Sequence, residues 1–202
     1  MNTVKKLPGL LAALLALTLT VPALAEPSSG LELDRRSSAI QFFVDAKLVD
    51  VEASFRAFKV DGLQFDGKNP ESLKGSIVIW PASVFTRDKK RDEHLRQDDF
   101  FWVEKYPTST VKLLSVSKTD VSGVYDFHIE LHIRDKTKEY TVPTKVLLQD
   151  GGLSLQGAWQ VDRRDFDLNG EHVANLVMNN MVDLKYTINL KKIQANAEAK
   201  TE

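Results

Sequence analysis

Apolar and polar residues alternate with a period of two along most of the chain after residue 30. The clearest run places five apolar side chains at every second position, namely Tyr125, Phe127, Ile129, Leu131 and Ile133. Successive side chains of a β-strand point to opposite faces of a sheet, so this run predicts a strand with one apolar and one polar face. Because the pattern recurs between turn signals such as Asp-Gly pairs, it predicts an antiparallel sheet with one wet face.

The alternating runs predict about eight strands in a single all-β domain. They cover residues 40–45, 53–60, 73–80, 125–133, 140–148, 153–161 and 182–190. The phase changes between Ala57 and Phe58, as a β-bulge would require. Strands at such short spacing favour a sandwich or an up-and-down barrel, and a barrel of this size is either filled by side chains or holds one small ligand.

Two segments interrupt the alternation, and a third ends it. Residues 88–103 are predicted to form a short helical insert, and residues 163–180 an irregular stretch. Residues 193–202 are rich in alanine and charge, so we expect a frayed tail after a domain that spans residues 26–192.

The segment from Arg91 to Pro107 has a charged first half and an aromatic second half. Phe100, Phe101 and Trp102 follow one another directly, and three consecutive side chains cannot all point the same way. One or two of them are expected to close one end of the barrel as ordinary core. The alternative is that at least one lines an internal tunnel.

The first 25 residues have the pattern of a secretory signal peptide. Lys5 and Lys6 precede an apolar stretch from Leu7 to Val21, and Ala23-Leu24-Ala25 offers the small residues that signal peptidase reads. The apolar stretch is short for a membrane span. We predict cleavage after Ala25, export to a bacterial periplasm and no membrane span in the mature chain; the alternative is a retained anchor.

Composition narrows the function classes. The chain has 0 cysteines, which excludes disulfides, thiolate metal sites and cysteine nucleophiles. The net charge is −1, and loss of Lys5 and Lys6 would change it to about −3, so a nucleic-acid partner, which needs a basic surface, is not expected. No Gly-x-Ser-x-Gly, His-Glu-x-x-His or phosphate-binding glycine loop occurs, and we expect no enzyme activity and no cofactor.

Three histidines invite a metal interpretation that the spacing does not support. His94 follows Asp92 and Glu93 without a second histidine at ligand spacing, so we expect Asp92 to cap a short helix and His94 to bond the loop backbone. His128 and His132 alternate with Asp126 and Glu130, opposite the strongest apolar face. The expectation is an outer, solvated wall and no metal site.

Five stretches in register resemble the YceI family of exported bacterial proteins. Residues 38–42 (SAIQF) and 54–58 (SFRAF) resemble its first two strands. Its longest signature resembles residues 83–86 (SVFT), 91–95 (RDEHL), 99–101 (DFF) and 106–107 (YP), and two later landmarks resemble residues 137–138 (TK) and 164–166 (RDF). The resemblance covers residues 33–191, nearly all of the predicted mature chain.

The resemblance implies an extended, lipocalin-like antiparallel barrel that binds long apolar chains, polyisoprenoids above all or fatty amphiphiles. It also implies a homodimer in some relatives. This chain departs from the family pattern at Ile129, His132, Asp135 and Asp167, and the departures fall where the family shapes its barrel rim.

Strand faces and the resemblance together predict the contacts of such a ligand. The predicted tunnel lining is Phe42, Val44, Phe55, Ile77, Ile79, Phe100, Phe101, Val111 and Trp159. The predicted head-group contacts are Arg91, His94 and Arg164, with a purely structural role in the loops as the alternative. Two other functions stay open: a filled barrel that acts through its surface in interaction or stress response, and an enzyme acting on a lipid-like substrate.

Overall fold

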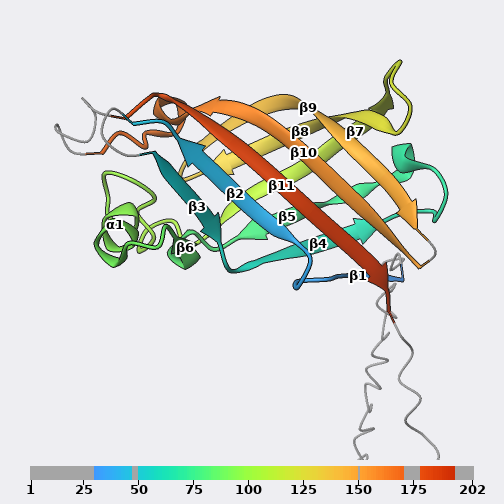
Figure 1. Cartoon of the computed structure of the whole chain (residues 1–202), viewed down its shortest axis with the longest axis horizontal. Coiled ribbons are helices and arrows are strands. Elements are labelled where there is room, and N and C mark those ends of the chain that lie inside the picture. The colour runs from blue at the N-terminus through green and yellow to red at the C-terminus, as the bar shows by residue number, and fades with distance from the viewer. Residues whose placement is uncertain (1–29, 47–49, 150, 171–177, 194–202) are drawn as a thin grey trace, which may run out of the picture.

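The fold is a single antiparallel sheet with one α-helix at one end (Figure 1). A computed structural model describes residues 30–46, 50–149, 151–170 and 178–193; the predicted signal peptide and residues 194–202 lie outside them. The strands are β1 (Leu31–Leu33), β2 (Ala39–Val44), β3 (Val51–Phe55), β4 (Phe58–Gln64), β5 (Lys74–Ile79), β6 (Val84–Phe85), β7 (Ser109–Lys118), β8 (Val124–Ile133), β9 (Lys136–Gln149), β10 (Gly152–Asp162) and β11 (Met181–Lys192). The helices are η1 (Pro70–Ser72), η2 (Pro81–Ser83), α1 (Lys89–Leu95) and η3 (Arg163–Phe166).

The sheet curls into an elongated barrel. Strands β3 and β4 are two parts of one kinked strand, and they lie at opposite ends of the sheet's strand order. That order is β4-β5-β7-β8-β9-β10-β11-β2-β3-β6, with β1 beside β11. Only Arg56 and Ala57 separate β3 from β4, yet β3 pairs with β2 while β4 pairs with β5. If β3–β4 counts as one strand and the short β1 and β6 are set aside, the wall has eight strands, as the sequence predicted.

The kink is hydrogen-bonded to the 3₁₀ turn η2. The backbone N–H of Arg56 donates to the carbonyl of Ser83 at 3.2 Å, and that of Ala57 donates to Ser83 Oγ at 2.9 Å. Inward positions change from odd numbers before the kink (Ala53) to even numbers after it (Phe58). The predicted phase change between Ala57 and Phe58 is therefore confirmed.

A second irregularity, which the alternation did not predict, lies in β7. The register against β8 shifts between Leu113 and Ser115, so Val111 faces Leu131 while Val116 faces Phe127. The extra residue turns an odd-numbered inward face into an even-numbered one. Leu114, at the bulge, is consequently 42% exposed.

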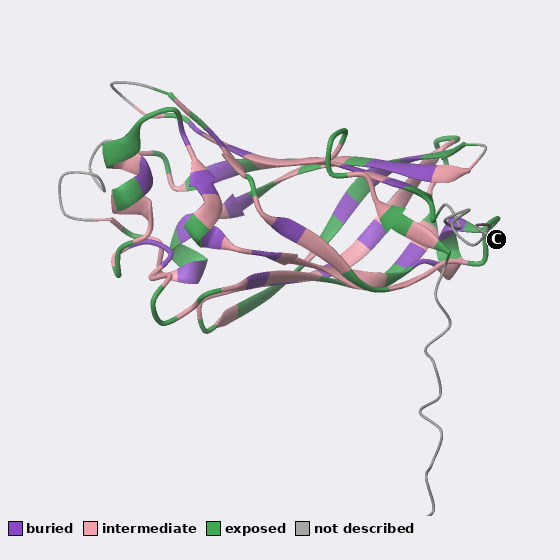
Figure 2. Cartoon of the chain, turned by 90° about the horizontal axis from the view of Figure 1, so that it is seen from below, coloured by how far each residue is buried: buried purple, intermediate pink, exposed green. Residues whose placement is uncertain are grey.

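Two clusters of buried apolar side chains occupy the two halves of the barrel. One includes Leu153 and Leu190 near the β9–β10 turn, and the other includes Phe166 and Val84 near α1. Phe55, Val111, Tyr140 and Trp159 contact both clusters and are only partly buried. Figure 2 shows this intermediate exposure along the middle of the barrel. Inward side chains that stay partly exposed between two packed clusters indicate an unfilled interior.

The predicted insert is a shorter helix than residues 88–103. Helix α1 covers Lys89–Leu95, and its N-cap is Asp88, whose carboxylate accepts from the N–H groups of Lys90 and Arg91. The expectation that Asp92 caps the helix is wrong. Asp92 is buried and accepts instead from Thr86 N and Oγ1, both at 2.7 Å.

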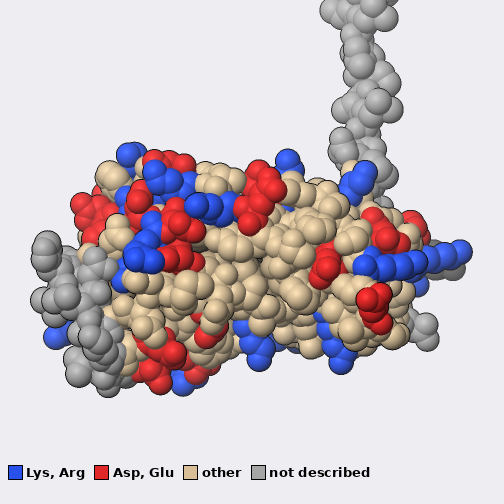
Figure 3. Space-filling view, turned by 90° about the horizontal axis from the view of Figure 1, so that it is seen from above, with Lys and Arg blue, Asp and Glu red and all other residues tan. Residues whose placement is uncertain are grey.

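The outer surface carries charges of both signs. On the face in Figure 3, acidic and basic side chains lie beside one another, so this face has no continuous basic field. Within the described part of the chain, no helix has the length and apolar character needed to cross a membrane.

Candidate functional site

An apolar tunnel of about 360 Å³ runs along the inside of the barrel. It extends from Leu63 and Leu73, at the β4–β5 end, to Leu95 and Leu168 beside α1. All nine residues predicted to line a tunnel do line it: Phe42, Val44, Phe55, Ile77, Ile79, Phe100, Phe101, Val111 and Trp159. Ligand pockets commonly measure roughly 300–1,000 Å³ and are mostly apolar. The space therefore has the size and lining of a binding site, although ligand contact at these residues stays a prediction.

Three phenylalanines form the wall of the tunnel at the α1 end. The ring centroid of Phe55 lies 5.5 Å from that of Phe42 and 5.6 Å from that of Phe101. Phe101 enters from the loop after α1, where its N–H donates to the carbonyl of Leu95 at 3.1 Å. This loop thus closes part of one end of the barrel with an aromatic side chain.

The two other aromatic residues of that loop, Phe100 and Trp102, lie in different surroundings. Phe100 is buried edge-on against His94, with ring centroids 5.0 Å apart. Trp102 adopts a left-handed backbone conformation (φ 46°) and packs outside against Tyr106 and Lys105. Phe100 and Phe101 line the tunnel and Trp102 does not. As expected from the sequence, the three consecutive aromatic side chains do not all point the same way.

Tyr186 supplies a polar point in the middle of the tunnel. Its hydroxyl lies 2.5 Å from Thr144 Oγ1, and its ring stands edge-on to Trp159 at 5.9 Å. Burial raises the pKa of Tyr186 to about 12, and the hydrogen bond with Thr144 partly opposes the shift. Tyr186 is not among the residues that the sequence predicts to line the tunnel, although the alternation of residues 182–190 places it on the inward face.

Arg91 and His94 lie at the α1 end of the tunnel lining. Arg91 Nη2 donates to the carbonyl of Thr86 at 2.9 Å, as expected for a loop contact. His94 Nε2 lies 2.9 Å from the Asp99 carboxylate, so it bonds a side chain and not the loop backbone. Both residues hold the loop after α1, and contact with a head group stays a prediction for them.

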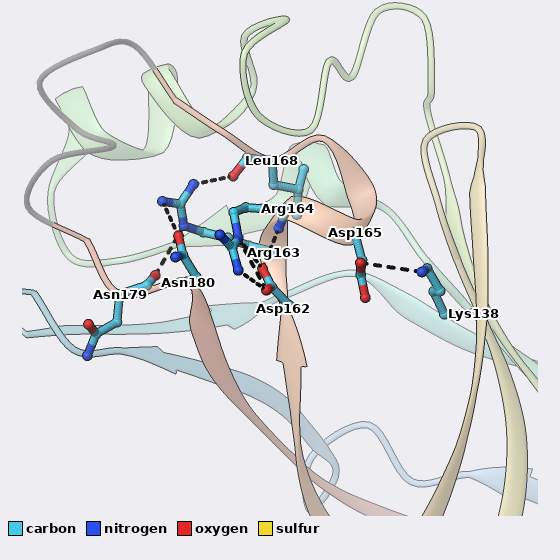
Figure 4. A network of polar contacts seen from close by, with 8 residues as sticks. All are labelled: Lys138, Asp162, Arg163, Arg164, Asp165, Leu168, Asn179 and Asn180. Atoms are coloured by element: carbon cyan, nitrogen blue, oxygen red, sulfur yellow. Dashed lines mark hydrogen bonds and ion pairs between the residues drawn. The ribbon is translucent and has the colours of Figure 1, made fainter.

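Arg164 points away from the tunnel, and its neighbour Arg163 takes the inward place (Figure 4). Arg164 Nε donates to the Asp162 carboxylate at 3.0 Å and 3.2 Å, which raises the pKa of Arg164 and lowers that of Asp162. Arg164 is exposed and is absent from the tunnel lining. The structure therefore places Arg164 outside the tunnel lining, because the turn of η3 directs the two side chains to opposite sides. Contact of Arg164 with a head group stays a prediction.

Arg163 is only 3% exposed and joins the loop after η3 to the start of β11. Its Nη1 donates to the carbonyls of Leu168 at 2.8 Å and Asn169 at 2.9 Å, and its Nε donates to the carbonyl of Asn179 at 3.1 Å. Desolvation lowers the pKa of Arg163, while the charge of Asp162 opposes that shift. Its bonding pattern is that of a structural clamp.

The histidines of β8 lie on the outer wall. His128 Nδ1 lies 2.9 Å from Thr141 Oγ1 on the neighbouring strand, whereas the tunnel is lined by Phe127, Ile129 and Leu131. Across the described ranges, no group of three or more His, Cys, Asp and Glu side chains is arranged to hold a metal ion.

An eight-stranded antiparallel wall around an apolar tunnel, with a helix at one end, defines a lipocalin-like barrel. The family model of the YceI-like domain matches residues 31–191. The chain belongs to this family.

Curated relatives carry the same family resemblance. A UPF0312 protein of Ectopseudomonas mendocina is 33% identical over 52% of this chain and 57% of its own length. Protein YceI of Escherichia coli O157:H7 is 32% identical over 53% of this chain and 52% of its own length. The chain thus spans about half of each of these two, whereas a UPF0312 protein of Staphylococcus epidermidis is 28% identical over 79% of this chain and 82% of its own length.

Solved structures share the fold. Burkholderia cenocepacia BcnA has a TM-score of 0.72 at 21% identity, over 78% of this chain and 99% of that protein. A polyisoprenoid binding domain from Saccharophagus degradans has a TM-score of 0.67 at 18% identity, over 82% of this chain and 100% of that domain. At such identities the similarity shows the barrel fold alone.

Proposed function

We propose that this protein binds a long-chain amphiphile, such as a polyisoprenoid, with the apolar chain inside the barrel. The observation that carries the proposal is the continuous tunnel of about 360 Å³ whose walls include partly exposed Phe55, Ile77 and Val111. These side chains face inward and stay partly exposed. The fold shared with the polyisoprenoid binding domain of Saccharophagus degradans supports the same ligand class.

The hydrophobic effect supplies enough free energy for such binding. Each methylene removed from water contributes about 0.8 kcal/mol, so ten carbons contribute roughly 8 kcal/mol. Association itself opposes binding by roughly 4–15 kcal/mol. An apolar chain of about ten carbons or fewer would therefore bind weakly, and a longer chain that follows the length of the barrel is favoured.

The proposal includes no chemical step. Several polar groups of the tunnel lining are engaged with each other or with the loops, as in the pairs Tyr186–Thr144 and His94–Asp99. The protein would act in a bacterial periplasm as a carrier or a store, after removal of residues 1–25. Tunnel binding is favoured over a barrel that acts only through its surface, because a filled barrel would leave no continuous internal space.

Lipid analysis of the purified protein tests the proposal. The protein is produced with its full leader, purified without detergent and measured by native mass spectrometry, followed by solvent extraction. One amphiphile with a long apolar chain per barrel is the expected result. Repeated preparations without any bound amphiphile, combined with no binding of added geranylgeraniol, would contradict it.

A further inference from the structure

The barrel wall has a seam where β4 faces β1 and β2. In the described chain, strand pairing joins β4 to β5, while β1 pairs with β11 and β2 pairs with β11 and β3. The ladder between β2 and β3 begins at Gln41, so Ala39 and Ile40 lie beyond its last pair. The kink at Arg56 then directs β4 away from β2. Among the described residues, no strand pairing therefore joins β4 to β2 at this place.

A groove of about 250 Å³ lies over the seam. Arg35, Ser38, Ser54 and Arg56 supply its polar lining. Ile40 and Phe55 also line the groove, and both residues line the tunnel as well. The outer groove and the inner tunnel are thus bounded by the same two apolar residues.

The two arginines of the groove are not neutralised by carboxylates. Arg35 and Arg56 are exposed, and neither forms an ion pair with any described residue. The guanidinium group of Arg56 lies over the ring of Phe85, 3.4 Å from its centroid. Stacking on an aromatic face orients a guanidinium group and leaves its edge donors accessible.

The acidic residues nearest in sequence to Arg35 and Arg56 are engaged with other groups. Glu52 lies 3.7 Å from Arg87, and Asp34 accepts from the N–H of Arg36 at 3.2 Å and from Ser37 Oγ at 2.8 Å. The groove lining itself contains no carboxylate. It is therefore a small basic concavity on a protein whose net charge is −1.

We propose that this groove binds the phosphate head of an amphiphile whose apolar chain enters the tunnel between Ile40 and Phe55. The inference rests on the proposed function and specifies the head group of its ligand. Guanidinium groups match phosphate oxygens with paired, charge-assisted hydrogen bonds, and the hydroxyls of Ser38 and Ser54 stand beside them. A neutral alcohol head group would gain little binding free energy from the two guanidinium groups.

The α1 end of the tunnel offers less to such a head. Arg163 donates to Leu168, Asn169 and Asn179. Arg91 donates to Thr86, and His94 is paired with Asp99. Most of these donors serve protein acceptors, although the buried Nε of Arg91 has no hydrogen-bond partner within the described chain. Arg35 and Arg56, by contrast, line the groove together and have no carboxylate partners among the described residues.

Binding of three probes tests the inference: geranylgeranyl phosphate, geranylgeraniol and inorganic phosphate. The wild-type protein is expected to bind the phosphate lipid about tenfold more tightly than the alcohol, since hydrogen bonds to charged groups are worth this much. The variant Arg35→Gln/Arg56→Gln is expected to lose the preference and keep its affinity for the alcohol. The control Arg36→Gln/Lys145→Gln has the same charge change outside the groove, keeps the ion pair between Arg87 and Glu52, and is expected to keep the preference.

Each other outcome overturns the inference in a recognisable way. Equal binding of both lipids by the wild type would contradict the phosphate site in the groove and leave the proposed function intact. No binding of either lipid would contradict both the phosphate site and the proposed function. Loss of the preference in Arg91→Gln, but not in the groove variant, would place the head at α1. Inorganic phosphate that binds as tightly as the phosphate lipid would indicate a site for free phosphate.

Salt provides a second measurement that needs no variant. Ionic screening is strong between exposed charges, so added salt is expected to weaken binding of the phosphate lipid to wild type and leave the alcohol unaffected. The same weakening for both lipids would contradict the inference even where the groove variant does not fold.

Discussion

The phenol ring of Tyr186 lies directly across the backbone of Gly157 on the neighbouring strand. The two residues are cross-strand partners, and a Cβ atom built on Gly157 would lie 2.6 Å from Tyr186 Cε1 and 2.7 Å from its hydroxyl oxygen. The tyrosine can therefore reach over β10 to Thr144 on β9, which is itself the partner of Gly157. A side chain at position 157 would prevent this arrangement.

Gly157→Ala is expected to destabilise the barrel by about 1–3 kcal/mol, the usual effect of an added methyl group in a packed site. The ring of Tyr186 must move away from β10 and lose its bond to Thr144. Urea unfolding measures the loss. Ala158→Val, on the exposed face of the same strand, serves as the control.

The same substitution in a Tyr186→Ala background is expected to be much milder. The double-mutant cycle isolates the clash between the two positions. A full loss of stability from Gly157→Ala without the tyrosine would show that the glycine serves another purpose.

Stability is expected to fall as the pH rises from 10 to 12 because of Tyr186. Its pKa is about 12 in the folded state against an ordinary tyrosine value of 10.0, so the folded protein keeps a proton that the unfolded chain loses. The contribution is complete below pH 10 and decreases by about 2–3 kcal/mol through this window.

Unfolding of Tyr186→Phe over the same pH range gives the comparison. The difference in stability between wild type and variant is expected to change with pH, while effects of other tyrosines, such as Tyr140 with its burial-raised pKa, cancel. Parallel curves for the two proteins would contradict the assignment.

Arg163→Met is expected to lower stability by about 2–4 kcal/mol, because it removes the buried guanidinium donors that bond the carbonyls of Leu168 and Asn179. Arg164→Met is expected to cost less than about 1 kcal/mol, since its ion pair with Asp162 is exposed to solvent. Chemical denaturation of the pair measures both values. Equal losses of stability in the two variants would contradict the structural role given to Arg163 and the exposed position given to Arg164.

Val111→Trp is expected to reduce amphiphile binding at least tenfold by filling the middle of the tunnel. Lys112→Trp adds the same side chain to the exposed face of β7 and is expected to bind normally. Titration with geranylgeraniol measures both affinities. Unchanged binding in Val111→Trp would mean that the ligand does not use the tunnel.

The mature protein recovered from the periplasm is expected to begin at Glu26, after cleavage behind Ala25. Intact-mass measurement gives the start directly. Ala25→Asp should block cleavage and retain the precursor, whereas Ala13→Ser within the apolar stretch should not. A protein that keeps Met1 in wild-type cells would contradict the prediction.

The sequence by itself determined the strand faces, since alternation is a local property of the chain. It was enough to locate seven of the eight wall strands, all except β7, and nine inward residues such as Phe42 and Trp159, all of which lie on the tunnel. The phase change at Ala57 was also readable, because a bulge alters the pattern where it occurs.

Only the tertiary structure decided which neighbours meet across the chain. It placed Arg163 inside and Arg164 outside, because the turn of η3 and the carbonyls of the following loop select one guanidinium group. It brought Asp92 to Thr86 in place of a helix cap, and it left β4 unpaired with β2 at the seam among the described residues. Such outcomes depend on contacts between distant segments, which periodicity along the chain does not encode.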